Sequence, residues 1–212
     1  MYTESFYIII LFFLLKIIAV KKAYSLIYNK KIFYKDIYLQ SLNLRNINKN
    51  YYNWLNNKFI NKYLECRFLK HSKASSLNYI KKINRSKNNL LFGIFYKDNH
   101  IGNIKISINK IHKRGTIGLL IGDRNFMRRG YGSSAVICLS NFAFRYLGLT
   151  RIFIGLYKKN LTSLYCFQKA GYSLEAEIKN YWISNNKSDN HIIMSLNKIF
   201  FLKNKHPDFY IQ

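Results

Sequence analysis

The chain lacks the cysteine spacing of a metal or redox site. Its three cysteines, Cys66, Cys138 and Cys166, are odd in number and lie far apart in the sequence. We therefore expect reduced thiols in a reducing compartment, which is typical of a cytoplasmic protein, and no bound metal.

Acidic residues are also scarce. The 9 Asp and Glu stand against 35 Lys and Arg, which gives a net charge of +26. Such an excess can indicate a polyanionic partner, namely nucleic acid, an anionic membrane or a phosphate-bearing ligand. The basic residues are spread along the chain, which favours a general drift in composition instead. The sequence has neither a compact Lys/Arg cluster nor the aromatic-plus-basic strand motifs of RNA modules, so it argues against nucleic acid as a partner. A basic RNA- or membrane-binding module is kept as an alternative.

No uncharged apolar run reaches the length of a clear membrane span. Residues 6–20 are almost entirely apolar but include Lys16, and a span takes about 20 apolar residues. A secretory signal would carry positive charge before the run, where only Glu4 lies. If the run inserts, Lys21 and Lys22 keep the rest of the chain in the cytoplasm. For residues 1–31 an anchor, a targeting segment, a docked helix and a misassigned start all stay open.

The length and the apolar content of the chain suffice for one domain with a full core, since it has 212 residues and about half are apolar. Periodicity predicts helices over residues 48–57, 58–64, 72–86, 130–147 and 160–170, and strands over 37–44, 90–96, 101–108, 118–121, 151–157, 172–182 and 191–196. Three consecutive antiparallel strands before the long helix do not fit a doubly wound nucleotide fold. The expected class is α+β, with a mixed, mostly antiparallel sheet flanked by helices.

The chain is organised around a buried strand, a basic loop and the start of the long helix. The first amides of a helix have no intrahelical partner and point outward with the positive end of the dipole behind them. Gly130 and Gly132 allow a phosphate to approach the backbone, and Arg128 and Arg129 add charge. This loop is predicted to hold a diphosphate, with Asp123 as its cap.

Three kinds of phosphate-binding loop compete for this segment. A P-loop needs a Lys that is missing here, and a dinucleotide fingerprint needs a third glycine where the chain has Ala135. The third kind is the acyl-CoA loop of the GNAT superfamily of N-acetyltransferases, Gln/Arg-x-x-Gly-x-Gly/Ala. The segment Met127-Arg128-Arg129-Gly130-Tyr131-Gly132 resembles it, with Met127 where Gln or Arg is usual.

Further segments in the correct order strengthen this resemblance. Residues 32–198 resemble the GNAT fold, in the branch of ribosomal-protein alanine N-acetyltransferases and sugar-pathway acetyltransferases, with 199–212 left as a C-terminal tail. The segments that carry the resemblance are residues 51–57, 62–68, 91–94, 101–104, 160–163 and 167–172.

The resemblance implies acetyl transfer from acetyl-CoA to a primary amine. Because a thioester is already activated, such an enzyme mainly positions the amine and stabilises the oxyanion. In the family the pantetheine arm pairs with the central strand, here at Leu120, Ile121 and Gly122. Asn160 is implied to bind the pantetheine or the amine, with Ser163 one turn on. The implied pyrophosphate contacts come from the loop and the helix start, at Arg128, Arg129, Gly130, Tyr131, Gly132, Ser133 and Ser134.

Two departures from the family affect the chemistry. The tyrosine that protonates the departing thiolate in many relatives is Phe167 here, and Tyr165 would lie on another face of the helix. The acidic base of many relatives is replaced by Thr116. His112 and Glu65, together with Asn160, are therefore the catalytic candidates. The alternative for His112 is a hydrogen-bonded turn residue, and for Glu65 a helix-end ion pair.

The expected protein is an acetyl-CoA-dependent N-acetyltransferase, acting as a monomer or homodimer. An amino sugar or other small amine is favoured as acceptor over a protein N-terminus, by analogy alone. A degenerate family member that binds the coenzyme without turnover is kept as a further alternative.

Overall fold

A computed structural model describes residues 30–44, 47, 49–184, 187–204 and 206–212. The apolar run at residues 6–20 lies outside these ranges. None of the helices found in them combines the length and the apolar character that a membrane crossing requires.

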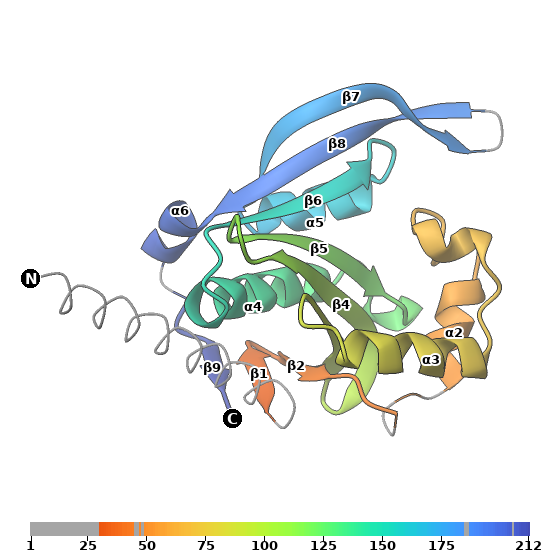
Figure 1. Ribbon diagram of the computed structural model, residues 1–212, viewed down its shortest axis with the longest axis horizontal. Helices are drawn as coiled ribbons and strands as arrows, with labels where there is room; N and C mark the ends of the chain where they lie inside the picture. Colours follow the sequence, from red (N-terminus) through yellow and green to blue (C-terminus); the bar gives the residue numbers. More distant parts are fainter. Residues whose placement is uncertain (1–29, 45–46, 48, 185–186, 205) are drawn as a thin grey trace, which may run out of the picture.

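One sheet of nine strands forms the frame of the described residues, in the order β7-β8-β6-β5-β4-β3-β2-β1-β9 (Figure 1). Every neighbouring pair is antiparallel except β5 and β6. This confirms the expected α+β class. The strands are β1 (Lys31–Tyr34), β2 (Ile37–Ser41), β3 (Asn89–Tyr96), β4 (Asn99–Asn109), β5 (Arg114–Ile121), β6 (Arg151–Tyr157), β7 (Ser173–Ser184), β8 (Lys187–Asn197) and β9 (Phe209–Ile211).

Helices cover both faces of this sheet. Leu90 and Phe92 of β3 pack into the main core with the long helix α4, whereas Leu91 between them packs into a second core with α2 and α3. Because side chains alternate along a strand, the two cores lie on opposite faces. The helices are α2 (Lys49–Asn56), α3 (Lys73–Asn84), α4 (Tyr131–Tyr146), α5 (Leu161–Lys169) and α6 (Lys198–Lys203), with short 3-10 helices η1 (Glu65–Phe68) and η2 (Arg124–Phe126).

The helix predicted over residues 58–64 is wrong, because the chain makes successive turns there before η1. The side-chain oxygen of Asn57 accepts the N–H groups of Phe59 at 3.0 Å and Ile60 at 3.3 Å. Such local side-chain bonds compete with helical ones. No strand or helix was predicted at β1, α6 and β9, because elements this short show no clear hydrophobic periodicity.

The one parallel pair of the sheet comes apart along its length. β5 pairs with β6 only from Arg114↔Arg151 to Thr116↔Phe153, whereas it pairs with β4 up to Ile121. Beyond Thr116 the two strands diverge (Figure 1). The resulting gap exposes one backbone edge of β5, and it opens at the end of the sheet where α4 begins.

The end of β5 also fixes α2 over the sheet. A Cβ atom on Gly122 would lie 2.0 Å from the ring of Trp54 in α2. Trp54 is buried and packs edge-on against His100, with ring centroids 5.1 Å apart. Only glycine at position 122 therefore allows α2 to pack so closely.

Gly122→Val is expected to displace Trp54 and to lower the free energy of unfolding by about 1–3 kcal/mol, the usual cost of overpacking. Denaturant unfolding followed by tryptophan fluorescence measures this loss. Gly118→Ala is the matched control, because its Cβ would meet nothing within 4 Å. An unchanged unfolding midpoint for Gly122→Val would contradict the contact.

Candidate active site

The loop between β5 and α4 is built by local hydrogen bonds. Asp123 accepts the N–H of Asn125 at 2.9 Å and caps the short helix η2, as predicted. The chain then reaches Gly130, the N-cap of α4, in the left-handed conformation with φ of +87°. The predicted strand, loop and helix start are therefore in place.

The two glycines of this loop have different physical roles. A Cβ on Gly130 would point into open space, with only Lys169 Nζ nearby at 4.0 Å. A Cβ on Gly132 would face inward, 3.1 Å from Cys166 Sγ and 3.4 Å from Leu119. Gly130 thus leaves room for a ligand, whereas Gly132 lets α4 pack closely against α5 and β5.

The free backbone donors at this helix start are the amides of residues 129–133. Within the described chain, none of these five N–H groups has a backbone acceptor. The N–H of Ser134, which was also predicted to contact the pyrophosphate, donates to Gly130 O at 3.0 Å at the start of the helix. The Ser133 hydroxyl donates to Cys166 O at 3.0 Å and so links α4 to α5. An anion at this site would be held by main-chain amides rather than by serine hydroxyls.

Three cations surround these amides. Arg128 and Arg129 are exposed on the loop, and Lys169 reaches Gly130 from the last turn of α5. None of the three is paired with a carboxylate of the described residues. Lys169 was missed from the sequence because its approach depends on how α5 packs against α4.

The open edge of β5 presents different residues from those predicted. Gly122 N–H donates to Ile101 O at 2.9 Å, so Gly122 faces β4. Hydrogen-bonding direction alternates along a strand, so Leu120 faces β4 as well, and the backbone groups of Leu119 and Ile121 face the gap. Of the three predicted pantetheine contacts, Ile121 alone lies on the open edge, and Leu119 joins it.

Asn160 lies at the far side of the gap as the N-cap of α5. Its side-chain oxygen accepts the N–H of Ser163 at 3.3 Å, and its own N–H donates to Tyr157 O at 2.9 Å. These bonds fix Asn160 at the end of β6 and leave its side-chain NH₂ group to donate.

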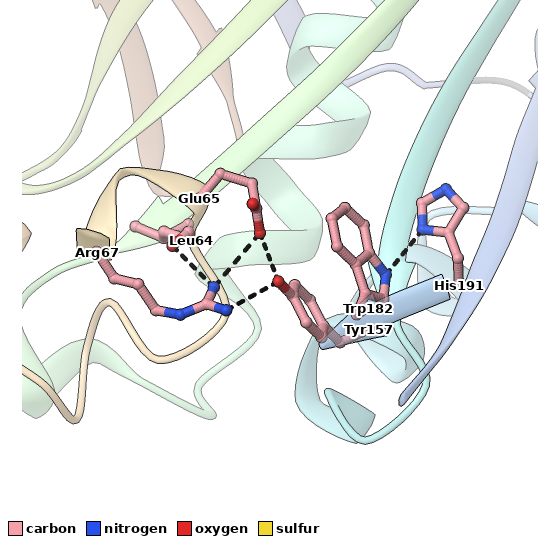
Figure 2. A network of polar contacts seen from close by, with 6 residues as sticks. All are labelled: Leu64, Glu65, Arg67, Tyr157, Trp182 and His191. Carbon is pink, nitrogen blue, oxygen red and sulfur yellow. Dashed lines mark hydrogen bonds and ion pairs between the residues drawn. The ribbon is translucent and has the colours of Figure 1, made fainter. Parts of the chain in front are cut away.

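Glu65 belongs to a polar network that also lies at the end of β6 (Figure 2). The Tyr157 hydroxyl donates to Glu65 Oε1 at 2.5 Å and accepts from Arg67 Nη2 at 2.9 Å. Arg67 Nη1 also pairs with Glu65 Oε1 at 3.4 Å. Burial, and then the bond to Glu65, raise the pKa of Tyr157, so its phenol stays protonated and holds the carboxylate.

An aromatic wall supports Tyr157 from β7 and β8. The Trp182 ring stacks on it, with centroids 4.4 Å apart, and the Trp182 indole N–H donates to His191 Nδ1 at 3.1 Å (Figure 2). His191 lies over Gly155 of β6, where a Cβ would be 2.3 Å from the imidazole. Burial lowers the pKa of His191, so the neutral ring can accept this bond. Sequence reasoning missed Arg67, Tyr157, Trp182 and His191, because the network joins segments far apart in the chain.

His112 is not brought to this site. It is exposed in the turn between β4 and β5, where its N–H donates to Asn109 Oδ1 at 3.0 Å. The adjacent Lys113 O accepts from Thr150 N–H at 2.8 Å, just past the C-terminal end of α4. With 16 residues, α4 is about 24 Å long, so His112 and Gly130 lie at opposite ends of it.

The structure offers no hydroxyl at the position where many relatives place their tyrosine. Phe167 is 1% exposed and packs edge-on against Tyr172. Tyr165 is 64% exposed. Thr116 lies where β5 and β6 part.

Within the described ranges, no three His, Cys, Asp or Glu side chains are grouped to hold a metal ion.

In a comparison with protein families, the acetyltransferase (GNAT) domain matches residues 38–173. No curated protein matches the chain.

Solved structures share the fold at low sequence identity. The microcin self-immunity acetyltransferase MccE, solved with acetyl-CoA and AMP, is 22% identical, with 77% of this chain and 93% of that chain covered and a TM-score of 0.67. The spermidine N-acetyltransferase of Vibrio cholerae, solved with CoA and spermine, is 18% identical, with 79% and 98% covered and a TM-score of 0.69. The ribosomal-protein alpha-N-acetyltransferase RimL, solved with coenzyme A, is 16% identical, with 77% and 94% covered and a TM-score of 0.67.

Proposed function

The chain belongs to the GNAT acetyltransferase family, and we propose that it moves an acetyl group from acetyl-CoA to the primary amine of a small acceptor in the gap between β5 and β6. The observation that carries this proposal is the parting of β5 from β6 beyond Thr116, beside the unpaired amides at the start of α4. A phosphate site and an open strand edge thus lie next to each other, as a diphosphate with an extended amide-bearing arm requires.

The coenzyme is held by this chain's backbone and by three cations. The amides of residues 129–133 take the pyrophosphate, and Arg128, Arg129 and Lys169 neutralise it. The pantetheine arm lies along the open edge of β5 and pairs with Leu119 and Ile121. Asn160, held as the cap of α5, donates its side-chain NH₂ group to the arm or to the acceptor.

The acceptor amine lies on the Glu65 side of the gap. Glu65 binds the ammonium form and takes its proton, directly or through water, while Tyr157 and Arg67 hold the carboxylate in place. The neutral nitrogen attacks the thioester carbonyl, the nitrogen then loses its excess proton to water, the C–S bond breaks, and an acetamide and coenzyme A thiolate form. Phe167 provides no proton, and a thiol pKa of about 8.5 makes an unassisted thiolate a workable leaving group.

The proposal of a small acceptor is supported by the size of the cavity beside Tyr157, and not by the substrates of the similar structures. The cavity beside Tyr157 is about 850 Å³, within the range of pockets for small molecules. The similar structures act on chemically different amines by name, a polyamine and a ribosomal protein, so they leave the acceptor undecided. We favour a small amine such as an amino sugar, free or nucleotide-linked, and a protein N-terminus is the second candidate.

Purified protein incubated with acetyl-CoA and a panel of amines is expected to release free thiol in an amine-dependent way. Acetyl-CoA alone should raise the Tm, because a ligand that binds only the folded state stabilises it. Stabilisation without thiol release for any amine would instead indicate a degenerate coenzyme-binding protein. Failure of acetyl-CoA to bind, together with salt-sensitive RNA binding, would favour the basic RNA-binding alternative.

A further inference from the structure

The cavity beside Tyr157 is lined by an unusual concentration of positive charge. Four of its basic residues come from the segment after α2, one comes from the turn between β6 and α5, and one comes from β8. Six of its 14 described lining residues are basic, against 35 of 212 in the whole chain, and Asp189 is the single acid among those 14. Composition drift alone does not produce this density. The six are Lys58, Lys62, Arg67, Lys70, Lys159 and Lys187.

These charges are largely unneutralised. Of the six, only Arg67 forms an ion pair with a carboxylate of the described residues, and its partner is Glu65. Asp189 is occupied by backbone N–H groups, those of Lys159 at 3.2 Å and Asn190 at 2.9 Å. The Lys159 ammonium donates to Ser188 O, a neutral acceptor, at 3.1 Å. Five lysines therefore leave the cavity with a net positive potential, which repels polycations and attracts anions.

The cavity and the Glu65 network share two residues. Arg67 and Tyr157 line the cavity and also contact the Glu65 carboxylate. Glu65 is not itself among the lining residues, but it is bonded to these two. A ligand in this cavity thus lies close to the Glu65 carboxylate and beside several ammonium groups. This arrangement fits a molecule with an amine at one end and an anion at the other.

We propose that the acceptor amine carries a phosphate group, which the lysines of this cavity bind while the amine lies at Glu65. The inference rests on the proposed acetyl transfer. A phosphate has up to two negative charges and several acceptor oxygens, so it pairs with more ammonium groups than one carboxylate does. Phe68 and Leu69, both 67% exposed, line the same cavity and provide an apolar surface for the sugar or base.

Matched pairs of acceptors test the proposal by activity. Glucosamine 6-phosphate against glucosamine, and phosphoethanolamine against ethanolamine, differ only by the phosphate, and a nucleotide-linked amino sugar forms a third arm. We expect kcat/KM at least about 10-fold higher for the phosphorylated member, falling towards equality at high salt. A larger increase in kcat/KM for the nucleotide-linked amino sugar would identify the phosphate as part of a nucleotide. Equal rates within each pair, or faster acetylation of spermidine or of an acidic N-terminal peptide, would overturn the proposal.

The double variant Lys58→Gln/Lys187→Gln tests the cavity itself. It should lower kcat/KM for the phosphorylated acceptor to near the value for its unphosphorylated partner. Lys81→Gln/Lys82→Gln removes the same charge from the exposed surface of α3 and is the matched control, with the phosphate preference expected to be unchanged. A preference that survives in the cavity variant, or that is lost equally in both variants, would overturn the assignment.

A binding measurement separates this inference from the proposed function. Calorimetry with AMP and with inorganic phosphate is carried out at saturating coenzyme A, so that the phosphate site of α4 is already filled. Binding that is lost in the cavity variant supports the inference even if the correct amine is absent from the panel. No binding of either probe overturns it, even if the protein acetylates other amines. Failure of coenzyme A itself to bind contradicts the proposed function instead.

Discussion

Replacing Gly130 by valine is expected to weaken acetyl-CoA binding about 100-fold. Residue 130 has φ of +87°, which costs a β-branched residue on the order of 1–3 kcal/mol, and the new side chain would point into the space over the free amides. The loop must therefore either change its backbone conformation or hold a side chain where the pyrophosphate would lie. Calorimetric titration of the coenzyme measures the loss.

Gly132→Ala is the matched control for this loop. Its Cβ would lie 3.1 Å from Cys166 Sγ, on the inner side of α4. This change should lower the Tm and leave most of the coenzyme affinity in place. If Gly130→Val binds acetyl-CoA as tightly as the unmodified protein while remaining folded, the pyrophosphate does not bind at this helix start.

Glu65→Gln is expected to lower kcat/KM for the acceptor amine about 100-fold, at the lower end of the effect of a general base. Glutamine keeps an oxygen that can accept the Tyr157 hydroxyl, but it carries no charge for the ammonium and takes no proton. Affinity for acetyl-CoA should be unchanged. The deficit should shrink at a pH above the pKa of the acceptor amine, because the amine is then already neutral. Initial rates across a pH series measure both effects.

Asp98→Asn provides the matched control. Asp98 also accepts a tyrosine hydroxyl, that of Tyr38 at 2.8 Å, and it also pairs with a cation, Lys31 at 3.3 Å. It lies in the turn between β3 and β4, on the side of β5 opposite β6, and neither of its partners belongs to the proposed site, so its replacement should leave kcat/KM unchanged. Full activity of Glu65→Gln would reduce Glu65 to a structural partner of Arg67.

The arrangement of the proposed coenzyme site was largely predictable because its parts are close together in the sequence. The strand, the arginines and Gly130 lie within about a dozen residues, and each has a local physical role. Two details depended on contacts with other elements. Which residues of β5 face the gap follows from its register with β4, and Lys169 reaches Gly130 only because α5 packs on α4.

The acceptor half could be predicted only in part. Glu65 was chosen as a candidate by its chemistry, but its partner Tyr157 lies 92 positions away, and no sequence period links the two. His112 shows the opposite failure, because its side chain suits proton transfer but its turn lies at the wrong end of β5. Residue type indicates which chemistry is available, whereas the sheet decides where that chemistry is located.

The pairing of β9 with β1 bears on how the chain is made. Lys31 N–H donates to Gln212 O at 2.9 Å, and the rings of Phe33 and Tyr210 stack with centroids 4.6 Å apart. During synthesis β1 leaves the ribosome early, but its outer edge stays unpaired until residues 209–211 have been added. Unpaired strand edges promote aggregation. Until β9 has formed, the outer edge of β1 is therefore open to pairing with another chain.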